Sequence, residues 1–187
     1  PIGGDPAPSS DLASFTSPRI EALAALELTP RRVEVRRVAQ AMRDIIESLV
    51  SSTAATEDLT AAADELERLA GALGALPGGQ TYQGFAEAAI AGELPDDAER
   101  WAFFDHSPFI GLANPMSPPM LLSYEEDRVV CDVTFGSAYE GPPGCVHGGY
   151  VAGAFDELLG AAQSLSGTQG MTAHLDVDYR RPTPLHV

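Results

Sequence analysis

The stretch that most constrains this chain is a glycine-rich turn that runs directly into an apolar helix. The turn reads Gly-Cys-Val-His-Gly-Gly over residues 144–149, and an apolar segment rich in Ala, Leu and Gly continues to about residue 165. An acid pair, Asp156 and Glu157, lies in the middle of that segment. Because an unpaired charge is costly to bury, the helix must either expose this face to water or use an acid chemically.

Two glycines fall in the first turn of the predicted helix. The backbone N–H groups of a first helical turn have no intrahelical partner and lie at the positive end of the helix dipole. Gly148 and Gly149 would allow close approach of a ligand to these groups. A carbonyl oxygen that becomes an oxyanion would be stabilised there, and His147 at the cap is placed to orient a substrate.

The acid and the histidine are separated by a spacing that decides how they can act together. Asp156 follows His147 by nine residues. At about 100° per residue, a regular helix places these two side chains on opposite faces. One protomer therefore does not bring them to one site, whereas two neighbouring copies of the helix can. The spacing predicts a two-fold homodimer in which each site combines the helix start of one protomer with the acid of its partner.

Upstream of this stretch the sequence predicts helices. Residues 1–17 are rich in Pro, Gly and Ser, which is typical of a flexible lead-in. Apolar residues recur at three- and four-residue steps over about 31–50 and again over 59–76, which predicts an antiparallel helical hairpin. We assign this hairpin to a helical extension spanning residues 18–104. It either packs on its own chain or serves as a dimerisation or lid element.

After residue 105 the apolar period changes to two, which is typical of half-buried strands. The pattern predicts a hairpin over 120–135, the apolar helix, and a last strand over 172–180. Residues 105–187 therefore form a second domain, and the fold class is α+β.

Charge and composition limit the classes of partner and cofactor that the protein can bind. The net charge is −16, with 27 acidic residues against 11 basic ones, so nucleic acid is excluded as a partner because phosphate binding needs clustered positive charge. No apolar run reaches the roughly 20 residues that span a bilayer, and no signal segment opens the chain. We expect a cytoplasmic protein without membrane insertion. No ligand cluster has metal-binding spacing, so no metal or other cofactor is expected.

At the turn and helix the chain resembles a known family, the hotdog-fold acyl-CoA thioesterases of the PaaI-like and THEM4-like group. Three motifs carry the resemblance: residues 139–149 with His-Gly-Gly, 155–160 with the spaced Asp, and 177–184 with an Arg-Pro strand. It covers roughly 120–187, and the first hundred residues fall outside it. The resemblance implies a hotdog fold, in which a curved antiparallel sheet wraps a long central helix, assembled as a homodimer or dimer of dimers.

The resemblance also implies an activity and roles for residues. The reaction is hydrolysis of acyl-CoA thioesters to free acid and CoA, with the CoA thioester as substrate and no cofactor. By position, Gly149 together with Gly148 would supply the oxyanion N–H, and His147 would position the thioester carbonyl. Asp156 would be nucleophile or general base, and Thr172 would support the water or the acid.

Further residues are candidates for substrate binding. His174 is the second choice for the role of Thr172. Many relatives carry Asn where this chain has Gly141, and Glu140 would replace that contact. Because CoA is polyanionic, basic groups must offset its charge, and Arg180 and Arg181 are the nearest candidates. An arginine cluster at residues 31–37 is an alternative source of positive charge for CoA.

The missing Asn at Gly141 and an incomplete sheet leave other functions open. A hotdog sheet needs about two or three strands beyond those in residues 105–187, so we expect the visible hotdog domain to be truncated at Val187 and completed by further chain or a partner. The alternatives are a non-catalytic acyl-CoA-binding or regulatory hotdog protein, or a helical interaction protein that its hotdog half dimerises.

Overall fold

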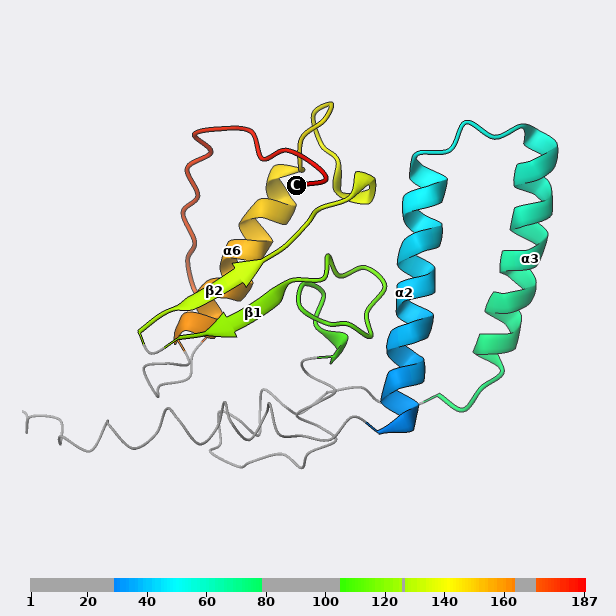
Figure 1. Ribbon diagram of the computed structural model, residues 1–187, viewed down its shortest axis with the longest axis horizontal. Coiled ribbons are helices and arrows are strands. Elements are labelled where there is room, and N and C mark those ends of the chain that lie inside the picture. The colour runs from blue at the N-terminus through cyan, green and yellow to red at the C-terminus, as the bar shows by residue number, and fades with distance from the viewer. Residues whose placement is uncertain (1–28, 79–104, 126, 164–170) are drawn as a thin grey trace, which may run out of the picture.

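A computed structural model describes residues 29–78, 105–125, 127–163 and 171–187. The elements in chain order are α2 (Pro30–Val50), α3 (Thr56–Gly74), β1 (Leu121–Tyr124), β2 (Val129–Asp132), the 3-10 turn η2 (Ser137–Tyr139) and α6 (Gly148–Gln163) (Figure 1). The predicted lead-in at residues 1–17 lies outside the described residues, and so do the parts of the predicted extension at 18–28 and 79–104.

Helix α2 begins where local signals predict a helix start. The Thr29 side chain accepts a hydrogen bond from the Arg32 N–H at 3.4 Å, and Pro30 occupies the first helical position, where an N–H would have no helical partner anyway. Helices α2 and α3 run antiparallel and are joined by residues 51–55 (Figure 1). The predicted helical hairpin is therefore confirmed.

The apolar stripe of α3 is poorly covered. All of its residues are exposed, and the leucines of the stripe remain 38–44% exposed at Leu59, Leu66, Leu69 and Leu73. Helix α3 thus adds no residue to the buried core of the described chain.

No described helix has the length and apolar character needed to cross a membrane.

Arginines of α2 fix this helix to the segment that precedes β1. Arg32 and Arg36 both bind the carboxylate of Asp105, at 2.8 and 2.6 Å, and Asp105 is only 6% exposed. Arg43 donates to the carbonyl of Asn114 at 2.9 Å, and burial lowers the pKa of its guanidinium. The arginine cluster at residues 31–37 is the alternative candidate for CoA binding. Two of its members, Arg32 and Arg36, instead hold α2 against the segment that precedes β1.

Strands β1 and β2 form an antiparallel hairpin in the register Leu121↔Asp132 to Tyr124↔Val129. The predicted hairpin is confirmed, although β2 ends at Asp132 rather than at residue 135. Helix α6 lies against this hairpin (Figure 1).

The core sits between the start of α6 and the turn that leads to it. Phe135, Tyr139 and Val146 are buried there. The rings of Tyr139 and Tyr150 meet edge to face, with centroids 4.8 Å apart, an arrangement that adds to the stabilisation from burial. The start of α6 is therefore held by an aromatic cluster.

The predicted final strand at 172–180 is wrong, because the sheet in the described part of the chain contains only β1 and β2. Alternating apolar residues favour an extended backbone, but a strand also needs a neighbour that supplies hydrogen bonds. The segment is instead tied at its far end, where the Val146 N–H donates to the Thr183 carbonyl at 2.8 Å. The described fold is mixed α+β, and the predicted curved sheet around a long helix is present only as this two-stranded hairpin.

Candidate functional site

The site turn (residues 140–147) is a closed loop that delivers His147 to the start of α6. Glu140 and Val146 form an isolated antiparallel bridge across it. Gly144 has φ 75°, a left-handed conformation that favours glycine, and its N–H donates to the Glu140 carboxylate at 2.6 Å. Glu140, predicted as a substrate contact, thus has its carboxylate engaged in closing the turn.

Gly141 is required by close packing inside the site turn. A Cβ at this position would lie 2.7 Å from the Cα of His147, closer than backbone atoms tolerate. A side chain such as the Asn of many relatives would therefore displace His147. The missing Asn contact has a steric cause in this chain.

His147 caps helix α6 with both its carbonyl and its ring. The carbonyl accepts the Tyr150 N–H at 2.9 Å, and Nδ1 accepts the Gly149 N–H at 3.0 Å. Because Nδ1 accepts, the ring proton of the neutral imidazole is on Nε2, which is free to donate outward. The Gly149 N–H that the sequence assigns to an oxyanion is held by His147 here, so an oxyanion gains it only when the imidazole turns away.

Tyr179 covers the first turn of α6 from the C-terminal segment. Its hydroxyl donates to the Gly148 carbonyl at 2.8 Å, and its ring lies 3.3 Å from where a Cβ on Gly148 would be. Tyr179 is 58% exposed, so it borders the site. Sequence reasoning placed it only on the apolar side of a strand, because no local pattern reports a contact with a residue 31 positions away.

The two acids of α6 face different environments. The helix is continuous over Gly148–Gln163, which the prediction that His147 and Asp156 lie on opposite helix faces requires. Asp156 is exposed, and Phe155 and Leu159 beside it are 49% and 54% exposed. Glu157 instead turns toward its own chain, where the Ser107 hydroxyl donates to its carboxylate at 3.3 Å.

Glu157→Gln is expected to stabilise the protein at pH 7. Burial raises the pKa of Glu157, the hydrogen bond from Ser107 opposes this, and the charge of Asp156 adds to it. A raised folded-state pKa means that Glu157 favours folding below its unfolded pKa, and that this stability is lost as pH rises through the folded pKa. Thermal melts at pH 7 and pH 4 measure the effect: Gln should raise the melting temperature at pH 7 and give a smaller gain at pH 4.

Asp156→Asn is the matched control, because it neutralises the adjacent but exposed carboxylate. A Glu157→Gln protein that is no more stable than the parent at pH 7 would contradict burial as the cause.

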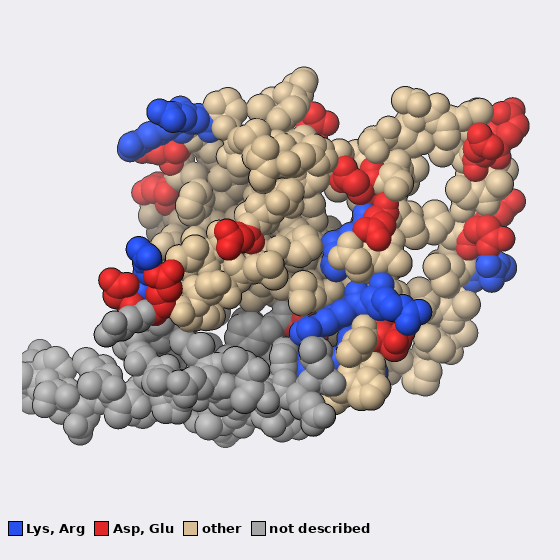
Figure 2. All heavy atoms as spheres, in the orientation of Figure 1, with Lys and Arg blue, Asp and Glu red and all other residues tan. Residues whose placement is uncertain are grey.

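The other predicted site residues lie on the exposed C-terminal segment: Thr172, His174, Arg180 and Arg181. His174 contacts Asp176 at 3.0 Å, and Arg180 lies 3.6 Å from Asp178. Figure 2 shows basic side chains over the lower part of α2 and where the C-terminal segment turns. Among the residues the structure describes, no group of three or more His, Cys, Asp or Glu is placed to hold a metal ion.

The structure thus gathers several predicted residues at the start of α6: Glu140, His147, Gly148 and Gly149. Asp156 lies about 13 Å further along the helix axis and on the opposite face. Thr172 is exposed on the C-terminal segment. Sequence reasoning missed Tyr179, and also Phe109, whose ring occupies the space beside Gly153. A glycine inside a helix was the available signal for that close approach.

An antiparallel hairpin packed on an apolar helix that follows His147 makes the described chain a mixed α+β protein. No protein-family profile matches the chain. The fold is similar to the crystal structure of a thioesterase superfamily protein, with TM-score 0.65 and 31% sequence identity over 81% of this chain and 70% of that one. The chain therefore belongs to the thioesterase superfamily. Because residues 105–187 are less than half of the chain, this likeness reaches into the helical extension, beyond the resemblance found in the motifs.

Curated relatives support the same family. The acyl-coenzyme A thioesterase THEM4 of Xenopus laevis is 42% identical over 66 residues, which are 35% of this chain and 30% of that protein. THEM4 of Rattus norvegicus is 39% identical over 66 residues, 35% of this chain and 28% of that protein. The predicted THEM4-like character is confirmed, although the match spans less than a third of the length of these relatives.

Proposed function

We propose that the chain hydrolyses acyl-CoA thioesters to the free acid and CoA at a site shared between two protomers. The observation that carries the proposal is the His147-Gly148-Gly149 start of α6 together with Asp156 on the opposite, exposed face of the same helix. The relatives named acyl-coenzyme A thioesterases support the substrate class.

The helix start would bind the thioester carbonyl. The Nε2–H of His147 would donate to the thioester carbonyl, and the Gly149 N–H would stabilise the negative charge on that oxygen once the imidazole has turned away from it. Asp156 of the neighbouring protomer would act as base toward water or attack the carbonyl itself. The thiolate of CoA leaves and takes up a proton, and the net reaction consumes one water.

The exposed face of α6 supports a paired arrangement. Phe155 and Leu159 flank Asp156 and are each about half exposed. A second copy of α6 would cover these apolar side chains and bring its own helix start toward the acid. This pairing would bring His147 of one protomer close to Asp156 of the other. Within a single protomer the two side chains lie on opposite faces of the helix and do not meet.

A non-catalytic acyl-CoA-binding protein is the second candidate. It is favoured by the occupied Gly149 N–H and by Gly141, which offers no side chain to the substrate. Such a protein would bind the thioester at the helix start without hydrolysing it.

Free-thiol release from short, long and aryl acyl-CoA substrates separates the two candidates. We expect release by the full chain and a background rate with Asp156→Asn, which controls for contaminating thioesterases. Calorimetric binding of an acyl-CoA without thiol release would support the second candidate. Neither binding nor release across the panel would reject both.

A further inference from the structure

We propose that Glu47 of α2 is a positioning residue for the site turn, so that the helical extension is part of the scaffold of the site. The proposal rests on the proposed function for the meaning of that site. It assigns a role to a helix that lies outside the motifs of the family resemblance.

The carboxylate of Glu47 lies at the start of η2. The Ser137 hydroxyl, and after it the backbone N–H groups of Ser137 and Ala138, act on this carboxylate and lower the pKa of Glu47. These N–H groups open a helical turn and have no partner within it. A Cβ on Gly136 would lie 2.5 Å from the carboxylate, so a glycine at this position leaves room for Glu47.

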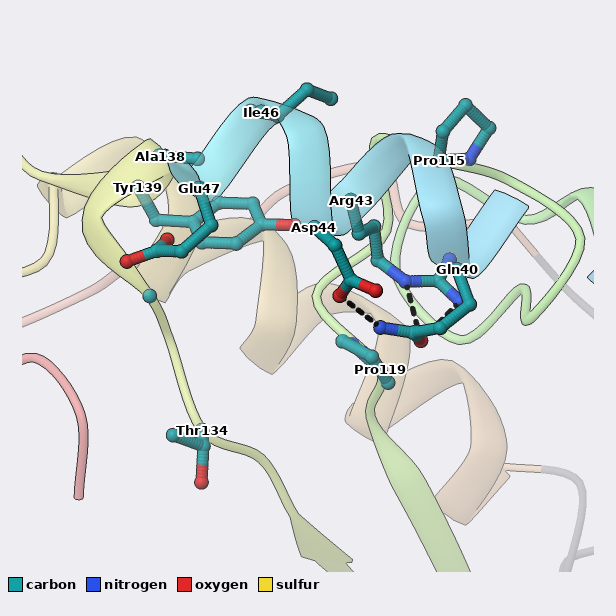
Figure 3. A pocket seen from close by; sticks show the side chains of 11 residues that line it. Gln40, Arg43, Asp44, Ile46, Glu47, Pro115, Pro119, Thr134, Ala138 and Tyr139 are labelled. Atoms are coloured by element: carbon teal, nitrogen blue, oxygen red, sulfur yellow. Dashed lines mark hydrogen bonds between the residues drawn. The ribbon is translucent and has the colours of Figure 1, made fainter. Parts of the chain in front are cut away.

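The turn η2 leads directly to His147. Its last residue is Tyr139, whose carbonyl accepts the His147 N–H at 2.8 Å. The Tyr139 ring is buried, and its hydroxyl donates to the Met116 carbonyl at 3.1 Å. Figure 3 shows Glu47 reaching from α2 toward the turn that carries Ala138 and Tyr139. A shift of η2 would therefore move the backbone of His147.

His186 joins the C-terminal segment to the same place. Its N–H donates to the Phe135 carbonyl at 2.8 Å, and its Nε2 lies 3.1 Å from the Ser137 hydroxyl and 4.0 Å from Glu47. These three side chains are not arranged as a catalytic triad, because Ser137 and Glu47 approach the same nitrogen of His186. A triad needs the acid on the other ring nitrogen.

The hollow beside Glu47 is too small to be the substrate site. It has a volume of about 160 Å³ and is lined by α2, by prolines before β1 and by η2 (Figure 3). Ligand pockets usually measure about 300 Å³ or more. Glu47 is therefore assigned to holding η2 and not to contacting substrate.

Amide hydrogen exchange tests the assignment without any substrate. In Glu47→Ala, the N–H groups of Tyr139 and His147 should exchange about tenfold faster, because the carboxylate that lies against the start of η2 is lost. The N–H of the buried Ala113 donates to the Asp105 carbonyl at 2.8 Å, outside η2 and the site turn, and should keep its rate. Asp44→Ala removes a carboxylate one turn away on α2 and should change none of these rates.

Kinetics then connect the contact to the site. At a temperature where all variants are folded, kcat/KM should fall about tenfold in Glu47→Ala, while Glu47→Gln, which keeps an acceptor oxygen, should recover much of the loss. Gly136→Ala perturbs the contact from the other side and should mimic Glu47→Ala. Unchanged exchange at His147 in both variants would overturn the proposal. Absence of hydrolysis by the parent protein would reject only the proposed function, since the exchange result stands by itself.

Discussion

An Asp156→Asn chain and a His147→Ala chain should recover activity when they share a dimer, although each variant is inactive as a homodimer. In the composite arrangement, the heterodimer has one site that combines the intact His147 of one chain with the intact Asp156 of the other. The second site combines both substitutions. A heterodimer isolated with two affinity tags should therefore show about half of wild-type kcat, and a random one-to-one mixture about a quarter.

The expected effect is large because each homodimer loses a group in both sites. Removal of a general base lowers the rate by about 10²- to 10⁴-fold. Recovery to about half of the wild-type rate is then far above background. Thiol release from an acyl-CoA that the parent hydrolyses is the measurement.

The control is a chain that carries both substitutions, paired with a wild-type chain. That heterodimer has no composite site with both groups intact, since each site lacks either His147 or Asp156, and it should remain inactive. If both groups of a site came from one protomer, the results would reverse: the control pair would be half active and the complementing pair inactive. A monomer by light scattering would likewise rule out the shared site.

Local signals in the sequence predicted the features whose causes are local. The Thr29-Pro30 start of α2 follows from capping chemistry within three residues. The start of α6 at Gly148 follows from the turn residues before it, and the exposed position of Asp156 is one of the two outcomes that the cost of burying charge left open. For these residues the nearest neighbours in sequence already determine the physical outcome.

Contacts between distant segments had no such signal. The Glu47 contact with η2 and the Tyr179 contact with Gly148 both depend on tertiary packing. The failed strand prediction at 172–180 has the same origin, because alternation shows which side of an extended segment is apolar but does not supply a pairing strand.

The buried carboxylate of Asp105 is expected to be the most sensitive point for stability. Its side chain is 8% exposed, and it holds Arg32 and Arg36, whose side chains are 13% and 21% exposed. Asp105→Asn keeps the shape but removes the charge that both guanidinium groups share. Loss of one member of a buried ion pair costs about 3 kcal/mol or more, so the free energy of unfolding should fall by at least about that amount. Urea unfolding followed by circular dichroism measures it.

Glu34→Gln is the matched control, because it neutralises an acid of the exposed Glu34–Arg37 pair on the same helix. Exposed pairs of this kind contribute about 0.5 kcal/mol or less. A double variant that combines Asp105→Asn with Arg36→Leu should lose less than the sum of its single variants, because the second change removes a charge that the first left buried. Equal losses for Asp105→Asn and Glu34→Gln would show that α2 is held by its apolar contacts and not by its arginines.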